Sequence, residues 1–154
     1  MPTFLQHKIP PPVLGVLVAL GMLYLAKAGE SLNWPMGVRW LGALGFFVVG
    51  LAIELTAIIS FRKAKTTINP LTPNDSSQLV AHGIYRLSRN PMYVGMVCQL
   101  LAMSWYLAAP ITLLGLPVFI WLINECQIKP EEAALKERFG EHFHQYQARV
   151  RRWL

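Results

Sequence analysis

Charged residues are scarce in this chain of 154 residues: Asp, Glu, Lys and Arg together make up 14%, whereas hydrophobic residues make up 54%. A soluble domain of this length rarely carries so little charge. The apolar residues also gather into long runs instead of recurring with a helical period, which is the pattern of membrane-spanning segments. Composition therefore predicts a single integral membrane domain over residues 1–154.

Cysteine is equally rare, and the spacings of common enzyme motifs are missing. Cys98 and Cys126 both lie inside apolar runs, where we expect small buried side chains and neither a disulfide nor a metal pair. His142 and His144 lie two positions apart on an expected helix and point apart, so no metal site is predicted. The sequence contains no Ser-His-Asp set, phosphate loop or dinucleotide fingerprint.

The formal net charge of +6 does not indicate nucleic-acid binding. The basic residues lie beside apolar runs and form no stripe with interleaved aromatic residues. Lys and Arg held on the cytoplasmic side of a membrane explain the same charge. The expected partners are membrane lipids and not nucleic acid.

Four apolar runs are long enough to cross a membrane as helices. We expect spans at about 13–29, 38–61, 91–108 and 111–128, followed by a tail over residues 129–154. Only Ala109 and Pro110 separate the last two runs, which predicts a tight helical hairpin. Pro130 is expected to close the fourth run. The predicted fold class is an all-α integral membrane protein with about four transmembrane helices.

The tail carries apolar residues at helical spacing and is expected to be amphipathic, with a break at Gly140 between two short helices. The residues of this apolar face are Leu135, Phe139, Phe143, Tyr146 and Val150. The first run has an alternative interpretation as a cleavable signal peptide, because Lys8 precedes it and Ala26-Lys27-Ala28 ends it. Lys27 within that site and the prolines before the run fit a signal peptide poorly.

Basic residues predict the orientation of the four spans. Both termini and the loop between the second and third spans share one side, which the positive-inside rule places in the cytoplasm. That side holds Lys8, Arg62, Lys63, Lys65, Arg86, Arg89, Lys129, Lys136, Arg138, Arg149, Arg151 and Arg152, against Lys27 and Arg39 opposite. Arg149, Arg151 and Arg152 are expected to face lipid headgroups.

Residues 82–95, HGIYRLSRNPMYVG, form a polar segment between the second and third spans. Pro91 suits the first turn of a helix and Asn90 suits the cap before it. The exposed N–H groups and positive dipole of that helix, with Arg89 beside them, would attract an anion or carboxylate.

The hairpin of the last two spans begins after Arg89 and ends before the pair Glu131 and Glu132, so we expect these residues to be neighbours. A positive helix end beside two carboxylates suits a zwitterion such as S-adenosylmethionine, whose ammonium or ribose hydroxyls the glutamates would bind. An alternative remains open, in which the arginine contacts lipid phosphates and the glutamates complement a helix dipole.

Glu54, Gln99 and Glu125 are polar residues within the predicted spans. A charged group there costs about 2.5–3.5 kcal/mol on insertion scales and usually faces a cavity or a partner. These residues are therefore candidates for contact with a substrate. The alternative is that they pair with each other between helices, or form an ion pair with a basic residue such as Arg86. An amine or thiol substrate would give Glu54, Glu125 or His82 a role as base.

Residues 82–95 and the later segment EEAALKERFGEHFHQYQARV resemble the isoprenylcysteine carboxyl methyltransferase and phospholipid methyltransferase superfamily. Arg89, Pro91, Tyr93 and Gly95 match its RxPxYxG motif. The Asn-Pro pair at 90–91 is typical of the phospholipid branch, whereas the isoprenylcysteine branch has His-Pro. Arg151 stands where many members have proline.

The resemblance implies an S-adenosylmethionine-dependent methyltransferase whose active site lies at the cytoplasmic leaflet. Its acceptor would be lipophilic and enter from the bilayer: an isoprenylcysteine-type carboxylate, a phospholipid amine or a similar small amphiphile. Arg89 and Glu132 would be catalytic, with Arg89 orienting the acceptor. The implied cofactor-binding residues are His82, Tyr85, Asn90, Pro91, Tyr93, Glu131, Glu132 and Tyr146. The alternatives are an NADPH-dependent membrane sterol-type reductase and a non-enzymatic lipid-binding relative.

Overall fold

The computed structural model describes residues 9–63 and 79–154, and within these ranges it contains helices and no strand. The all-α fold class is therefore confirmed for the described part of the chain. Lys8, Lys65 and the predicted loop at 66–77 lie outside the described residues. The elements in chain order are α1 (Pro11–Ala28), α2 (Met36–Lys63), η3 (Gly83–Arg86), α3 (Pro91–Leu107), η4 (Pro110–Leu114), α4 (Gly115–Ile123), η5 (Asn124–Ile128), α5 (Lys129–Phe139) and α6 (Glu141–Arg149).

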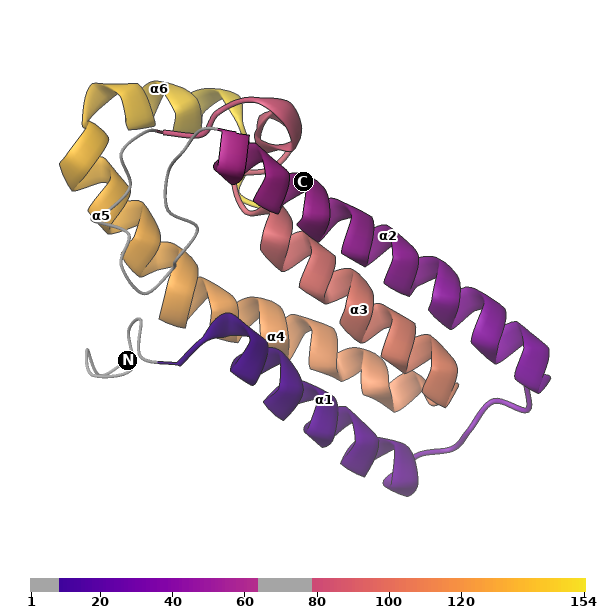
Figure 1. Cartoon of the computed structure of the whole chain (residues 1–154). Coiled ribbons are helices and arrows are strands. Elements are labelled where there is room, and N and C mark those ends of the chain that lie inside the picture. Colours follow the sequence, from indigo (N-terminus) through magenta and orange to yellow (C-terminus); the bar gives the residue numbers. More distant parts are fainter. Residues whose placement is uncertain (1–8, 64–78) are drawn as a thin grey trace.

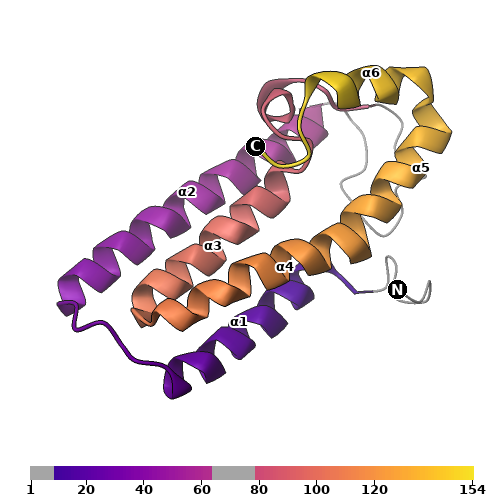
Figure 2. The same cartoon turned by 180° about the vertical axis from the view of Figure 1, so that it is seen from behind.

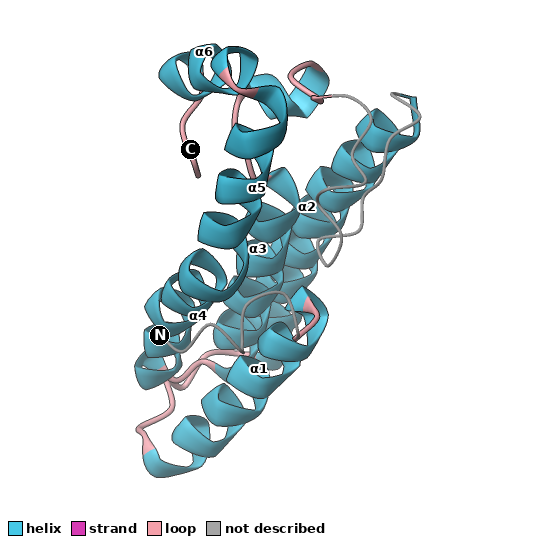
Figure 3. Cartoon of the chain, turned by 90° about the vertical axis from the view of Figure 1, so that its left-hand side faces the viewer, coloured by secondary structure: helices cyan, strands magenta, loops and turns pink. Residues whose placement is uncertain are grey.

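The long helices form a bundle, and the tail helices fold over one end of it. Figures 1 and 2 show α2, α3, α4 and α1 alongside one another in that order. Figure 3 shows that α6 crosses the end of the bundle that also carries the C-terminus. Apolar side chains face outward, as with Leu41 of α2, which is 75% exposed. This outer surface suits contact with lipid tails.

Three described segments are long and apolar enough to cross a membrane: Pro11–Ala28, Met36–Lys63 and Pro110–Phe139, with 18, 28 and 30 residues. The chain is therefore a membrane protein with several candidate spans. Helix α3 corresponds to the predicted span 91–108 and has 17 residues, which is about the lower limit for crossing. The four-span arrangement and its orientation stay predictions.

Helices α2 and α3 approach each other closely through glycine. A Cβ atom added at Gly50 would lie 2.7 Å from the carbonyl oxygen of Gly95, so neither position has room for a side chain. Trp105 Nε1 near the other end of α3 donates to the carbonyl oxygen of Val38, 3.1 Å away. These contacts hold the two helices side by side along much of their length.

A short turn connects α3 to the next segment. Ala108 has a φ of 50° and its N–H donates to the carbonyl oxygens of Ser104 and Trp105. The Oγ of Ser104 and the Oγ1 of Thr112 in η4 lie 2.7 Å apart in a hydrogen bond across this turn. Helix α1 packs against α4 through a core that includes Leu14 and Phe119.

The fourth apolar run ends before Pro130 as expected, but the prediction that its helix also ends there is wrong. The chain stays helical from α4 through the π turn η5 into α5, so Pro130 lies inside a continuous helix. Proline lacks an N–H and its ring clashes with the carbonyl of the residue four positions earlier. The wider π turn directly before Lys129 alters that hydrogen-bonding pattern and gives the ring room.

The helical tail breaks at Gly140, as the sequence predicted. Gly140 has a φ of 50° and ψ of −121°, a conformation that residues with a side chain adopt with strain. The break lets α6 turn back across the bundle end. The predicted apolar face then forms one cluster with Leu79, and its members are Leu135, Phe139, Phe143, Tyr146 and Val150.

Candidate functional site

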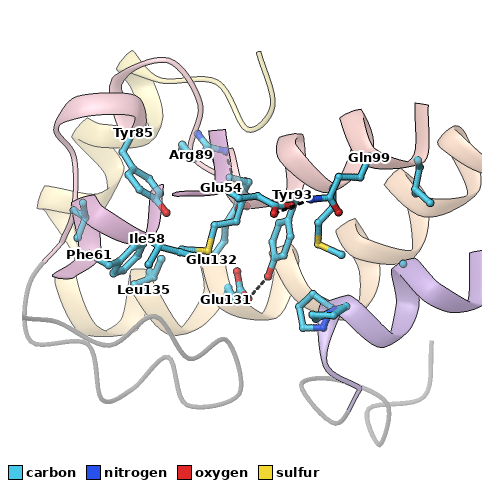
Figure 4. A pocket seen from close by; sticks show the side chains of 18 of the residues that line it. Glu54, Ile58, Phe61, Tyr85, Arg89, Tyr93, Gln99, Glu131, Glu132 and Leu135 are labelled. Carbon is cyan, nitrogen blue, oxygen red and sulfur yellow. Dashed lines mark hydrogen bonds and ion pairs between the residues drawn. The ribbon is translucent and has the colours of Figure 1, made fainter. Parts of the chain in front are cut away.

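A cavity of about 670 Å³ lies between the bundle and the tail helices. Its volume falls within the roughly 300–1,000 Å³ of small-molecule sites. Polar residues gather near the start of α3, and apolar residues of α1, α2 and α3 line the rest (Figure 4). The polar lining consists of Glu54, Tyr85, Arg89, Asn90, Tyr93, Gln99, Glu131, Glu132 and Tyr146.

Tyr93 and Glu131 form the first polar contact in this cavity. Tyr93 lies in the first turn of α3, and its hydroxyl donates to Glu131 Oε1 over 2.7 Å. Glu131 lies in the first turn of α5, just beyond Pro130. The helix continues through Pro130, and the Glu131 side chain projects from its next turn to the Tyr93 hydroxyl. Tyr93 orients the carboxylate, and no second donor to it is seen among residues 9–63 and 79–154.

Arg89 and Glu132 form the second contact, at the position that the sequence analysis expected. Arg89 Nη2 donates to Glu132 Oε1 over 2.8 Å, and the two side chains are 12% and 11% exposed. Arg89 Nη1 donates to the carbonyl oxygens of Gln147 and Val150, at 3.2 and 2.9 Å. Arg89 therefore ties α5 and the end of α6 to the start of α3. Its Nε is buried and has no hydrogen-bond partner among the described residues.

Arg152 completes the pairing of Glu132. Its Nε donates to Glu132 Oε1 at 3.1 Å and its Nη2 to Oε2 at 2.7 Å. The hydrogen bonds that Arg152 donates to the Glu132 carboxylate raise the pKa of its guanidinium, which stays charged. The expectation that Arg152 faces lipid headgroups is wrong, because its guanidinium donates to both oxygens of the buried Glu132 carboxylate.

The last residues of the chain, 150–154, lie beside the start of α3, and we call them the C-terminal segment. Arg89 N–H donates to the carbonyl oxygen of Arg151 at 3.0 Å. Asn90 Nδ2 and Ser88 Oγ both donate to the carbonyl oxygen of Arg152, at 2.9 and 3.3 Å. Asn90 thus precedes α3 as expected, but its side chain holds the C-terminal segment and makes no cap hydrogen bond.

Tyr85 and Tyr146 close the cavity on the side of η3 and α6. The Tyr146 hydroxyl donates to the carbonyl oxygen of Tyr85 over 2.7 Å. The Tyr85 ring packs edge-on against Phe61, with ring centroids 5.2 Å apart. Burial raises the pKa of both tyrosine hydroxyls, so they stay protonated and neutral. The resemblance implied that both residues contact the cofactor, and this stays a prediction.

Glu54 and Gln99 meet deeper in the same cavity. Gln99 Nε2 donates to Glu54 Oε2 over 2.9 Å, so Gln99 and not Arg86 is the observed partner of this carboxylate. The other oxygen, Oε1, is buried and has no hydrogen-bond partner among the described residues. Figure 4 shows the two side chains pointing toward each other beside Tyr93.

Three expected site residues are not part of the cavity lining: His82, Glu125 and Pro91. His82 is exposed and precedes η3. Glu125 forms an ion pair with Lys129, one helical turn further along. Pro91 is buried in the first turn of α3 and is not part of the lining either, whereas all the other expected residues line the same cavity. The sequence analysis missed Ser88 and the inward side chain of Arg152, because a basic residue near a chain end usually faces water or lipid.

Comparison with protein families matches residues 38–142 to the family described as phospholipid methyltransferase. A probable protein-S-isoprenylcysteine O-methyltransferase of Oryza sativa subsp. indica is 25% identical, over 87% of this chain and 72% of that protein. The fission yeast Schizosaccharomyces pombe has a protein-S-isoprenylcysteine O-methyltransferase that is 29% identical over 77% of this chain and 50% of its own length.

An uncharacterized protein of Haemophilus influenzae is 40% identical over 41% of this chain and 100% of its own length. No solved structure matches. The family match covers α2, α3 and α5, and so includes Arg89, Tyr93 and both glutamates of the polar cluster. The chain therefore belongs to the phospholipid methyltransferase family.

Proposed function

We propose that the protein transfers a methyl group from S-adenosylmethionine to a lipophilic acceptor, at the cytoplasmic leaflet of the membrane. The observation that carries the proposal is a single cavity that joins a charged end at Arg89 and Glu131 to an apolar part between α1, α2 and α3. A polar donor and a lipid-soluble acceptor can meet in such a space. The methyltransferase names of the relatives support the same reaction.

The residues of the charged end fit a zwitterionic sulfonium nucleoside. Glu131 is a carboxylate with a single protein donor, Tyr93, among the described residues, so it can accept from an ammonium or a ribose hydroxyl. Arg89 Nε is a buried donor without a partner in the described part, and it suits a carboxylate. The cavity lining thus includes an acceptor residue and a donor residue, which suit a ligand that bears both an ammonium and a carboxylate.

The sulfonium of S-adenosylmethionine supplies an electrophilic methyl group when it is bound. The protein then has to align the methyl donor with the acceptor and to exclude water, and neither task requires a catalytic triad. In this proposal Glu131 binds the cofactor and Tyr93 fixes the direction of its carboxylate. Tyr85, Asn90 and Tyr146 line the site and exclude water from it.

We assign Arg89 and Glu132 roles that differ from the catalytic roles implied by the resemblance. Two carbonyl oxygens and Glu132 take up the Nη atoms of Arg89, and two arginines take up both carboxylate oxygens of Glu132. We assign Glu132 to positioning: its carboxylate holds the Arg89 side chain at the wall of the cavity. The acceptor then lies toward Glu54 and Gln99, with its apolar chain along Met96, Leu100 and Met103.

Titration of purified protein with S-adenosylhomocysteine tests the proposal. We expect the wild type to bind, and Glu131→Gln to bind about 10-fold more weakly, because a hydrogen bond to a charged group is lost. Glu137→Gln is the matched control, since Glu137 is an exposed glutamate on the same helix. A wild type that binds NADPH and not S-adenosylhomocysteine would favour the reductase, and one that binds neither would favour a lipid-binding protein.

A further inference from the structure

A second hollow, of about 470 Å³, lies beside the cavity, and Leu79 and Tyr146 line both. Its volume also falls within the roughly 300–1,000 Å³ of small-molecule sites. The remaining lining comes from the turn around η3 and from α6 with its C-cap, and none of it lines the cavity. These residues are Ala81, Arg86, His142, Gln145, Arg149 and Val150. We call this hollow the basic pocket.

The charge of the basic pocket is positive. Arg86 of η3 and Arg149 of α6 line it from two separate elements. Both side chains are exposed, and neither forms an ion pair within residues 9–63 and 79–154. No Asp or Glu is among the described residues that line the pocket. Two guanidinium groups on one hollow repel each other, so an anion beside them is favourable.

Helix α6 adds further hydrogen-bond donors to the basic pocket. His142, Gln145 and Arg149 follow one another at steps of three and four, so they lie on one face of this helix. An imidazole, an amide and a guanidinium all carry N–H groups. A phosphate has several acceptor oxygens and binds arginine in a two-pronged manner. The pocket therefore suits a phosphate group.

The basic pocket lies at the level where α2 ends. The ring of Tyr85, the residue before Arg86, packs against Phe61 with ring centroids 5.2 Å apart. Figures 1 and 2 show the turn that carries η3 beside α6 and the end of α2. Helix α2 is a candidate span whose last two residues are the exposed Arg62 and Lys63. Basic residues at the end of a span lie among lipid headgroups, so the pocket is within reach of lipid phosphates.

We infer that the basic pocket binds the phosphate of an anionic phospholipid from the leaflet at which α2 ends. The inference does not depend on the proposed function, because Arg86 and Arg149 line this pocket and not the cavity. Leu87, directly after Arg86, is 70% exposed and offers an apolar contact to a lipid that a soluble phosphate does not use. A headgroup with net negative charge fits better than a zwitterionic one, whose ammonium would lie near the arginines.

Stabilisation of the full chain against heating in a neutral detergent tests the basic pocket. Dihexanoyl phosphatidylglycerol and dihexanoyl phosphatidylcholine have the same acyl chains and differ in net charge, whereas sn-glycerol 3-phosphate has the phosphate without the chains. We expect the wild type to bind phosphatidylglycerol about 10-fold more tightly than phosphatidylcholine, and to bind glycerol 3-phosphate weakly. Phosphatidylglycerol has neither an amine nor a carboxylate, so it lacks the reacting groups of the proposed acceptors.

Removal of single arginines distinguishes the basic pocket from general surface charge. Arg86→Gln and Arg149→Gln should each weaken phosphatidylglycerol about 10-fold, because a charged hydrogen bond to the phosphate is lost. Arg151→Gln is the matched control, since Arg151 is exposed, lies two residues after Arg149 and does not line the pocket. Its affinity should stay close to that of the wild type. Equal losses in all three variants would overturn the inference, because any basic residue would then serve.

A second pair of variants adds a charge and removes no arginine. Ala81→Glu places a carboxylate in the lining of the basic pocket, whereas Ala148→Glu places one at an exposed position of α6 outside it. The first should abolish the preference for phosphatidylglycerol and the second should retain it, since exposed charges act over short distances in salt. Equal affinity of the wild type for the two lipids would overturn the inference. Glycerol 3-phosphate that binds as tightly as phosphatidylglycerol would also overturn it, because the occupant would then be a soluble phosphate.

Discussion

Glu131 and Glu132 are neighbours in the chain, yet their carboxylates have different partners. Successive residues of an α-helix project in directions about 100° apart. Glu131 meets the hydroxyl of Tyr93, whereas Glu132 meets the guanidinium groups of Arg89 and Arg152. The first is suited to bind a ligand and the second to hold the protein together.

Substitution of each glutamate separates these roles. We expect Glu132→Gln to lower the free energy of unfolding by about 2–3 kcal/mol, because it leaves two arginines without their carboxylate. Glu131→Gln should change stability little and weaken S-adenosylhomocysteine binding instead. Thermal unfolding in detergent and calorimetric titration measure the two effects. Equal destabilisation by both variants would contradict the division.

Arg151 and Arg152 give a matched pair at the end of the chain. The Arg151 side chain is exposed, whereas Arg152 turns inward to Glu132. Arg152→Gln should therefore cost about 1–3 kcal/mol of stability through the lost charged hydrogen bonds. Arg151→Gln should stay within about 0.5 kcal/mol of the wild type, as for an ordinary surface change. Melting temperatures under one buffer condition compare them, and a larger loss for Arg151→Gln would refute the assignment.

At the scale of helices, glycine decides how closely α2 and α3 pack. Gly50→Ala would place a Cβ atom 2.7 Å from the backbone of Gly95, so we expect a loss of about 1–3 kcal/mol from overpacking. Gly45→Ala on the same helix is the control, because a Cβ atom there meets nothing within 4 Å. Replacing that glycine should leave stability equal or higher, since alanine favours helix. Thermal unfolding distinguishes the two outcomes.

The sequence predicted the elements that depend on local signals. Pro91 after Asn90 predicted where α3 begins, and Gly140 predicted where the tail breaks. The order of the apolar runs also predicted that Arg89 and Glu132 would meet. Each of these follows from backbone restrictions or from connectivity, which nearby residues determine.

Other features depend on contacts between distant parts of the chain and could not be predicted from the sequence. The helix passes Pro130 because η5 has a π turn, and no residue type in Asn124–Ile128 signals it. Arg152 turns inward because Glu132 is buried, which only the folded tail shows. The exposed position of His82 likewise follows from how η3 sits on the bundle.

For the whole molecule, the number of spans determines on which side of the membrane α5 lies. Three spans and four spans place it on opposite sides. If α3 crosses, Glu137 and Ser31 lie on opposite sides; if α3 does not cross, they share a side. We expect opposite sides, with Glu137 cytoplasmic. Cysteine at either position, in a chain with Cys98 and Cys126 replaced, reports its side through labelling by a thiol reagent that does not cross membranes. Both positions are exposed. Labelling of both from one side would contradict four spans.

The continuous helix from Gly115 to Phe139 works as a lever about 37 Å long. The N-terminal part of this helix, α4, is apolar and suited to contact the bilayer. Its C-terminal part, α5, carries Glu131 and Glu132. A thinner or thicker bilayer changes the tilt of a spanning helix. Because no flexible joint separates the two parts, such a change displaces both carboxylates relative to Tyr93 and Arg89. The thickness of the host membrane thereby becomes a variable that acts on the site itself.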